Sequence, residues 1–163
     1  MPPSTHAVRE GFAIDRGSST IRFLRDFEAS PEKVFRAWTR PEHIACWWDA
    51  LGEKLTRCEI DLKPGGHFLF LTAGHPDMPF QGIYREIVPP ARLVFEAMGS
   101  TGRVLLSPVD GGTRMTVEIQ CSSPEQLEQY LKIGIAVGTS QTLDNLVAYL
   151  KMNPSGLARS RAC

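Results

Sequence analysis

The sequence contains few of the residue combinations that carry out chemistry. Its four histidines form neither an H-x-x-x-H nor an H-E-x-x-H motif, and they form no cluster with cysteine. It has no G-x-S-x-G nucleophile motif, and the glycine pairs at 65–66 and 111–112 fit hairpin turns rather than phosphate-binding loops. We therefore expect no metal site and no cofactor, and the sequence leaves open whether the protein is an enzyme.

The four cysteines, Cys46, Cys58, Cys121 and Cys163, lack the C-x-x-C spacing of redox and zinc motifs. Cys58 and Cys121 fall within strand patterns, where a small apolar packing role is the ordinary one. These features predict reduced thiols and a cytoplasmic location.

Acid–base chemistry has one pair of candidates, Tyr84 and Glu86. They lie two residues apart in one predicted strand, so their side chains lie on the same face of the sheet. If that face points inward, both would enter or border a cavity. The opposite face, with Ile83 and Ile87, is equally apolar. The alternative is therefore that Glu86 lies in water or pairs with an arginine.

The element that must position any such site is a long C-terminal helix over residues 124–151. Ser123 is a good N-cap and Pro124 suits the first helical position. Its apolar stripe changes phase near Gly134 and Gly138, which predicts a kink or break there. Its buried face is bulky at both ends and small in the middle, so we expect space beneath it.

The rest of the chain predicts the partner of this helix. Residues 20–28 read as a strand, although Arg25 falls on the apolar face, either escaping to water or anchored inside a cavity. Two short helices follow, begun by Pro31 and Pro41. The adjacent Trp47 and Trp48 cannot both face the core, so one should lie at a rim.

Six antiparallel strands are predicted from residue 55 to residue 122, and only the long helix can cover their sheet. The order strand, two helices, six strands, helix indicates an α+β fold. We expect one domain over residues 20–152. A flexible N-terminal arm, with a short strand near residues 11–14, would occupy residues 1–19, and a disordered tail residues 153–163.

This order resembles the START/Bet v 1-like (SRPBCC) superfamily, in the branch named for the activator of the heat-shock-protein-90 ATPase. The likeness is carried by residues 25–31 (RDFEASP), 34–39 (VFRAWT), 41–42 (PE), 47–48 (WW), 61–66 (DLKPGG), 82–87 (GIYREI), 92–95 (RLVF), 112–115 (GTRM), 143–146 (LDNL) and 149–150 (YL). The resemblance implies a helix-grip fold, a curved seven-stranded antiparallel sheet around the C-terminal helix with an apolar cavity between them. Many relatives carry Trp at the position of Thr139, so Thr139 should enlarge this cavity or change its shape.

The residues that we expect to line the cavity come from the helices and several strands, and each could instead be ordinary core. They are Trp38, Trp47, Phe68, Phe70, Tyr84, Glu86, Phe95, Met98, Met115, Gly138, Thr139, Thr142 and Leu146. The leading hypothesis is the binding of a small hydrophobic or aromatic molecule, with Tyr84, Thr139 and Thr142 as polar groups that orient it.

Two other functions remain open from the sequence. One is a cyclase, dehydratase or hydrolase that uses the same cavity, with Glu86 as the first residue to substitute. The other is a co-chaperone-like stimulator of a heat-shock ATPase, which would make a cytosolic chaperone the partner. A homodimer is a further candidate assembly. The 18 basic and 18 acidic residues cancel, and no apolar run spans a bilayer, so nucleic acid and membrane partners are not expected.

Overall fold

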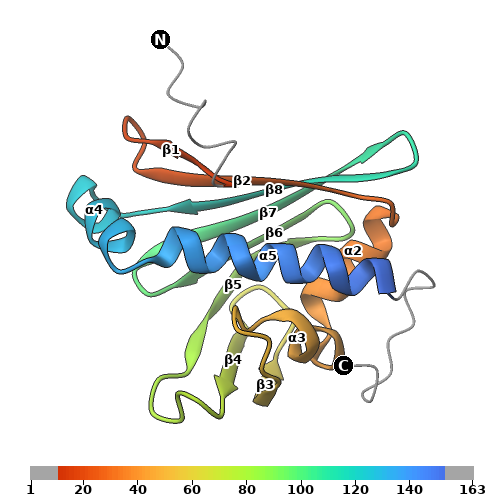
Figure 1. The fold of residues 1–163 in the computed structure, drawn as a ribbon, viewed down its shortest axis with the longest axis horizontal. Helices are drawn as coiled ribbons and strands as arrows, with labels where there is room; N and C mark the ends of the chain where they lie inside the picture. The colour runs from red at the N-terminus through yellow and green to blue at the C-terminus, as the bar shows by residue number, and fades with distance from the viewer. Residues whose placement is uncertain (1–10, 153–163) are drawn as a thin grey trace.

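The computed structural model describes residues 11–152, and the predictions for residues 1–10 and 153–163 lie outside this range. A curved antiparallel sheet surrounds a long helix, α5, with the shorter helices at its margins (Figure 1). The strands are β1 (Ala13–Asp15), β2 (Thr20–Phe27), β3 (Leu55–Ile60), β4 (His67–Thr72), β5 (Phe80–Val88), β6 (Arg92–Ala97), β7 (Ser100–Val109) and β8 (Gly112–Gln120). The helices are α2 (Pro31–Thr39), α3 (Pro41–Trp47), α4 (Pro124–Lys132) and α5 (Ile135–Met152). Of these helices, all within residues 11–152, none is long and apolar enough to cross a lipid bilayer.

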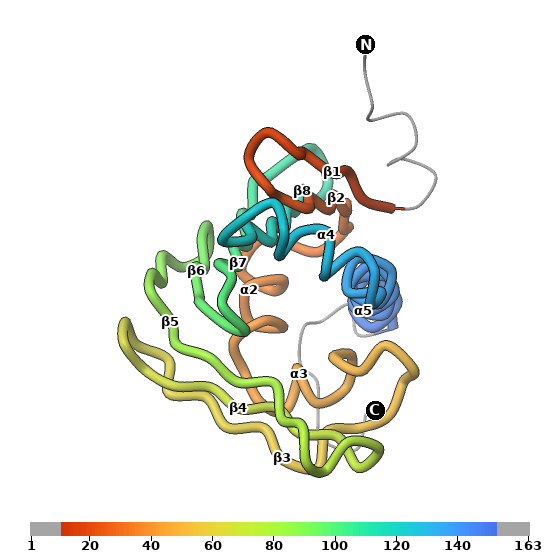
Figure 2. The backbone as a smooth tube through the Cα atoms, turned by 90° about the vertical axis from the view of Figure 1, so that its left-hand side faces the viewer, coloured from red at the N-terminus to blue at the C-terminus, as the bar shows by residue number. Residues whose placement is uncertain are grey.

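The sheet has eight strands in the order β1-β2-β8-β7-β6-β5-β4-β3, and every neighbouring pair is antiparallel. Seen from the side, it curves from β1 and β2 round to β3, and α5 lies across the open side (Figure 2). This confirms the predicted α+β helix-grip class.

The eighth strand is β1, which falls in the region predicted to be a flexible arm with only a short strand. It pairs with β2 in the register Ala13↔Arg22 to Asp15↔Thr20. This pairing covers the edge of β2, whose main-chain groups would otherwise be free on that side. The ordered sheet therefore begins before residue 20, where the predicted domain began.

Helix starts follow the predicted capping residues. Ser30 Oγ accepts a hydrogen bond from the Lys33 amide at 3.3 Å, and Pro31 is the first residue of α2. Ser123 caps α4 in the same way, with its Oγ 3.0 Å from the Gln126 amide nitrogen. These caps satisfy amides that have no partner inside the helix.

The predicted break in the C-terminal helix is confirmed. α4 ends at Lys132, α5 begins at Ile135, and Gly134 between them has a φ angle of +84°. A left-handed residue of this kind ends a helix, and glycine adopts it without steric cost.

Arg25 joins α5 to the sheet, rather than escaping to water or lining a cavity. Its guanidinium donates to Asp144 Oδ1 at 2.9 Å, to the Gly11 carbonyl at 2.9 Å and to Ser140 Oγ at 2.8 Å. Its side chain is only 12% exposed. The cation on the apolar face is thus a structural anchor with acceptors from the loop before β1 and from α5.

The prediction of reduced thiols holds for Cys58 and Cys121, which are free. It is wrong for Cys46, which is disulfide-bonded. Sequence spacing could not show this, because spacing does not report which thiols meet in the fold.

Candidate ligand-binding cavity

An aromatic wall forms between the two short helices and the sheet. Trp38 comes from α2, Trp48 follows α3, and Phe70, Phe80 and Phe95 come from β4, β5 and β6. The Trp48 ring centroid lies 4.9 Å from that of Phe70 and 5.1 Å from that of Phe80. Rings at these separations attract one another beyond the effect of buried area, so the wall is held together by its own contacts.

The two adjacent tryptophans take different roles. Trp47 is 1% exposed and its Nε1 donates to the Ala37 carbonyl at 3.0 Å, which fixes α3 against α2. Trp48 is partly buried and turns toward the other aromatic rings.

A cavity of about 410 Å³ lies between this wall, the sheet and α5. The sheet contributes Gly102, Val117 and Ile119. Gly102 pairs with Phe95 across the strands, and a Cβ at Gly102 would lie 2.5 Å from the Phe95 ring. The absent side chain therefore provides the room in which this ring lies.

The α5 side of the cavity is formed by the small residues near the middle of the C-terminal helical segment. Its lining residues are Gly134, Ile135, Gly138, Thr139, Thr142 and Leu143. A Cβ built on Gly138 would have no neighbour within 4 Å, so this part of the helix stands clear of the sheet. Small residues at the middle of the helix thus leave space below it, as expected.

The polar side chains around the cavity are mostly engaged by the protein itself. Thr142 Oγ1 donates to the Trp48 carbonyl at 3.1 Å, and the Tyr130 hydroxyl donates to the Met98 carbonyl at 2.7 Å. Asp49 Oδ2 accepts from the Leu51 amide at 2.9 Å. These bonds fix the walls and leave a mainly apolar interior.

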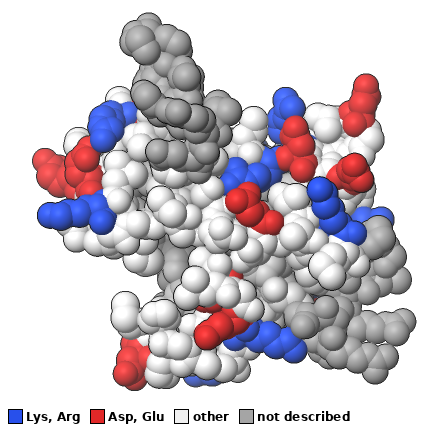
Figure 3. Space-filling view, viewed as in Figure 1, with Lys and Arg blue, Asp and Glu red and all other residues white. Residues whose placement is uncertain are grey.

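The rim is formed by the loops beside α3 and between β4 and β5, together with the α4–α5 junction. It includes Ala50, His75 and Met78, of which Met78 is 74% exposed. Figure 3 shows a hollow on this side of the molecule, below α4.

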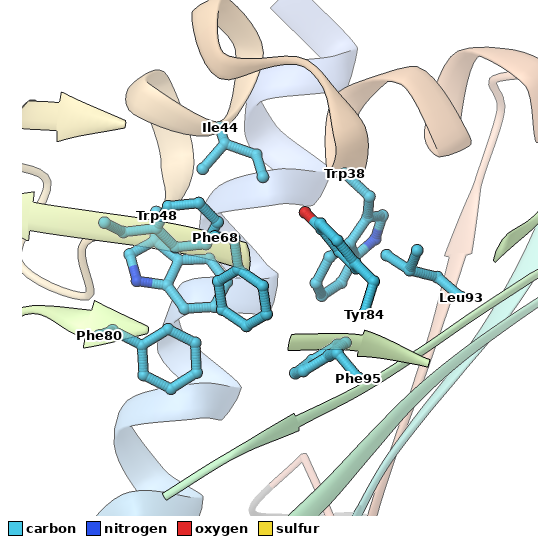
Figure 4. Close-up of a pocket in the computed structure, with 9 residues that line it drawn as sticks. Trp38, Ile44, Trp48, Phe68, Phe80, Tyr84, Leu93 and Phe95 are labelled. Carbon is cyan, nitrogen blue, oxygen red and sulfur yellow. The ribbon is translucent and has the colours of Figure 1, made fainter. Parts of the chain in front are cut away.

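A second, much smaller space of about 10 Å³ lies behind the aromatic wall (Figure 4). It shares Trp38, Trp48, Phe70, Phe80 and Phe95 with the large cavity, so the two spaces are neighbours and these side chains border both. Its remaining walls are Ile44, Phe68, Tyr84 and Leu93. We call this space the inner pocket.

The structure brings some of the predicted lining residues together around the two spaces. The large cavity is lined by Trp38, Phe70, Phe95, Met98, Gly138, Thr139 and Thr142, and the inner pocket by Phe68 and Tyr84. Trp47, Met115 and Leu146 border neither space and are core residues, with exposures of 1%, 0% and 0%. Met115 contributes indirectly, because its sulfur lies 3.3 Å from Trp38 Nε1.

Glu86 is not in the cavity, which corrects that prediction. A bulge between Tyr84 and Glu86 shifts the register, so that Tyr84 pairs with Phe95 and Glu86 with Val94. The extra residue ends the alternation, leaving Tyr84 inward and Glu86 on the surface. The Glu86 carboxylate pairs there with Arg92 and is 52% exposed.

Several residues that line the cavity were not among those predicted from the sequence. Phe80 shares its strand parity with Tyr84, so that signal was present. Gly102, Tyr130, His75 and Met78 reach the cavity through strand pairing, the helix break and a loop, none of which follows from local periodicity.

His43 forms a buried pair outside the cavity. Its Nδ1 lies 2.8 Å from the Tyr149 hydroxyl, which links α3 to α5. Burial lowers the pKa of His43 and raises the pKa of Tyr149 to about 12, so both are neutral near pH 7. Within residues 11–152, no three His, Cys, Asp or Glu side chains are placed to hold a metal ion.

Comparison with known proteins adds a family and a fold. Residues 28–151 match the family described as activator of Hsp90 ATPase homolog 1-like protein. Among proteins with curated functions, none matches the chain.

Solved structures with the same fold come from several bacteria. A protein from Nitrosomonas europaea has a TM-score of 0.75 at 23% identity, covering 83% of this chain and 96% of its own. One from Rhodobacter sphaeroides has a TM-score of 0.75 at 24% identity, covering 86% and 97%. The AHSA1-like protein from Aeromonas hydrophila has a TM-score of 0.68 at 24% identity, covering 86% and 96%.

Proposed function

The chain belongs to the family of activator of Hsp90 ATPase homolog 1-like proteins, and from this premise we propose that it binds a small hydrophobic or aromatic molecule. The ligand lies between the sheet and α5. Because one fold supports many unrelated functions, the proposal rests on the site rather than on the family.

The observation that carries the proposal is the cavity of about 410 Å³. Typical small-molecule sites have volumes of roughly 300–1,000 Å³ and are mainly apolar with a few polar groups. The aromatic wall provides flat surfaces for stacking, and the Thr139 hydroxyl provides a polar point on the helix side.

The positions of the acidic side chains favour a binding function over a catalytic one. Glu86, the first candidate for a general base, is paired with Arg92 on the surface. The Glu118 carboxylate, although its residue borders the cavity, pairs with Arg22 at 2.9 Å. A base engaged in this way is poorly placed to accept a proton from a molecule inside the cavity.

The test is a fluorescence titration with N-phenyl-1-naphthylamine, a neutral aromatic dye that brightens in apolar surroundings. Thr139→Trp places an indole in the cavity and should weaken dye binding at least about tenfold, which corresponds to roughly 1.4 kcal/mol. Ala148→Trp on the same helix is the matched control, because Ala148 is exposed and does not line the cavity.

Each outcome of the titration has a separate meaning. Saturable binding by the wild type and by Ala148→Trp, weakened in Thr139→Trp, supports the proposal. Equal binding in all three proteins would place the dye elsewhere, and absence of binding by the wild type would contradict the function itself.

A further inference from the structure

Tyr84 presents a buried hydroxyl group to the inner pocket. The residue is 2% exposed, and its oxygen points into the space between Ile44, Trp38 and Phe68 (Figure 4). Among residues 11–152, none hydrogen-bonds this hydroxyl. A hydroxyl that is largely removed from bulk water and has no partner carries a free-energy cost, so this one is suited to a hydrogen-bonding group that enters the inner pocket.

The inner pocket has the size of one ligand atom. Its volume of about 10 Å³ is close to that of a single water-sized sphere. A stable buried water needs two to four polar partners. The neighbouring indoles offer no second partner, because Trp38 Nε1 donates to Met115 Sδ and the Trp48 nitrogen lies on the side of its ring away from Tyr84 (Figure 4). The pocket therefore suits an oxygen that belongs to a larger apolar molecule better than it suits water.

Such a molecule could extend into the inner pocket from the large cavity. The aromatic wall borders both spaces, and its members Phe80 and Phe95 are only partly buried. Rotation of these rings is the movement that would be needed to join the spaces for an aromatic ligand.

We propose that the Tyr84 hydroxyl donates a hydrogen bond to the carbonyl oxygen of an aromatic ketone or a related neutral aryl carbonyl compound. The aromatic body occupies the large cavity and the oxygen occupies the inner pocket. This inference rests on the proposed function, and it adds the chemical class of the ligand and its orientation.

The direction of the hydrogen bond follows from the protonation state of the tyrosine. Burial raises the pKa of Tyr84 above its usual value of 10.0. The group is thus a neutral phenol at physiological pH and can donate its proton to a carbonyl oxygen. An anionic ligand would gain no cationic partner among the side chains that line the inner pocket within residues 11–152.

The experiment compares two probes of nearly equal shape, 2-acetylnaphthalene and 2-isopropenylnaphthalene. The second replaces the carbonyl oxygen by a methylene group. Competition against N-phenyl-1-naphthylamine gives the affinity of each probe for the wild type, Tyr84→Phe and Tyr149→Phe. Tyr149→Phe is the matched control, because it also removes the hydroxyl of a buried tyrosine but at a residue that lines neither space and pairs with His43.

We expect the wild type and Tyr149→Phe to prefer the ketone by about three- to tenfold, the range of one hydrogen bond. Tyr84→Phe should lose this preference while its affinity for the hydrocarbon stays unchanged. The infrared carbonyl stretch of the bound ketone should lie at lower frequency in the wild type than in Tyr84→Phe. The melting temperature of Tyr84→Phe should equal or exceed that of the wild type, because no hydrogen bond within the protein is lost.

The outcomes separate this inference from the proposed function. If the wild type binds both probes but Tyr84→Phe keeps the ketone preference, or loses affinity for both probes equally, the role of Tyr84 is wrong and the cavity assignment survives. If the wild type binds neither probe nor the dye, the proposed function fails and the role of Tyr84 fails with it.

Discussion

At the scale of single residues, the cavity is lined mainly by groups that have no charge to offer. The hydroxyls of Thr142 and Tyr130 and the carboxylate of Asp49 all bond to main-chain groups of the walls. Affinity must therefore come largely from the burial of apolar surface. We expect ligands to be discriminated by shape and by one or two hydrogen bonds rather than by ion pairing.

The buried pair of His43 and Tyr149 predicts how stability depends on pH. Burial, as the largest cause, lowers the pKa of His43 below its usual value of 6.5, so the unfolded state takes up a proton first as the pH falls. The contribution of the neutral, buried His43 to the free energy of unfolding is complete above about pH 6.5 and is lost as the pH drops below this value. Urea unfolding at pH 7.5 and 5.5 should show a larger loss for the wild type than for His43→Asn.

The control for this comparison is His67→Asn, which removes an exposed histidine. It should keep the pH dependence of the wild type. If His43→Asn kept it too, burial of His43 would not be its cause.

The placement of Tyr84 was within reach of the sequence, whereas that of Glu86 was not. Period-two alternation puts both on one face, and it is correct for Tyr84. The bulge that turns Glu86 outward arises from pairing with β6, a strand that begins several residues later. A pattern read along one strand contains no information on a register set by its neighbour.

At the scale of elements, the junction between α4 and α5 sets the space below the helix. Gly134, between the two helices, has a left-handed φ angle of +84°, and Gly138 one turn later stands clear of the sheet. Two glycines four residues apart thus have different physical reasons to be glycine.

Substitution by alanine should separate these two roles. Gly134→Ala forces a left-handed backbone on a residue with a Cβ and should lower the free energy of unfolding by about 1–2 kcal/mol. Gly138→Ala lies inside α5 with free space around its Cβ and should raise it by about 0.5–1 kcal/mol. Chemical denaturation of the two variants measures both values. Changes of the same sign would contradict this account of the junction.

Arg25 is the anchor between α5 and the β1–β2 edge, and its loss should loosen the helix. Arg25→Met removes the hydrogen bonds to the Gly11 carbonyl and Ser140 Oγ and should lower the free energy of unfolding by about 1–3 kcal/mol. Arg114→Met breaks an exposed surface pair with Asp26 and should cost clearly less than Arg25→Met. Equal losses, measured by urea unfolding, would show that Arg25 has no anchoring role.

Most elements could be predicted because their signals are local. Ser30 with Pro31, and Ser123 with Pro124, mark helix starts by satisfying free amides, and Gly134 marks a helix end. The short strand β1 is different, because three residues acquire strand structure only by pairing with β2. Its place in the sheet depends on an edge formed elsewhere in the chain.

At the scale of the whole molecule, the order of the elements determines the architecture. A sheet that is apolar on its inner face must be covered, and only the C-terminal helical segment is long enough to cover it. Bacterial proteins of 23–24% identity share this fold, so the architecture tolerates wide sequence change. The ligand could not be predicted in the same way, because the cavity depends on a few side chains that the architecture does not dictate.

The central claim is that the chain holds a small apolar molecule beneath α5. It is tested most directly by native mass spectrometry of the protein purified from the organism that encodes it. The account predicts one small neutral molecule for each chain in the wild type and in Ala148→Trp, and its loss in Thr139→Trp. A bare wild-type mass, together with no binding of N-phenyl-1-naphthylamine, would contradict the account.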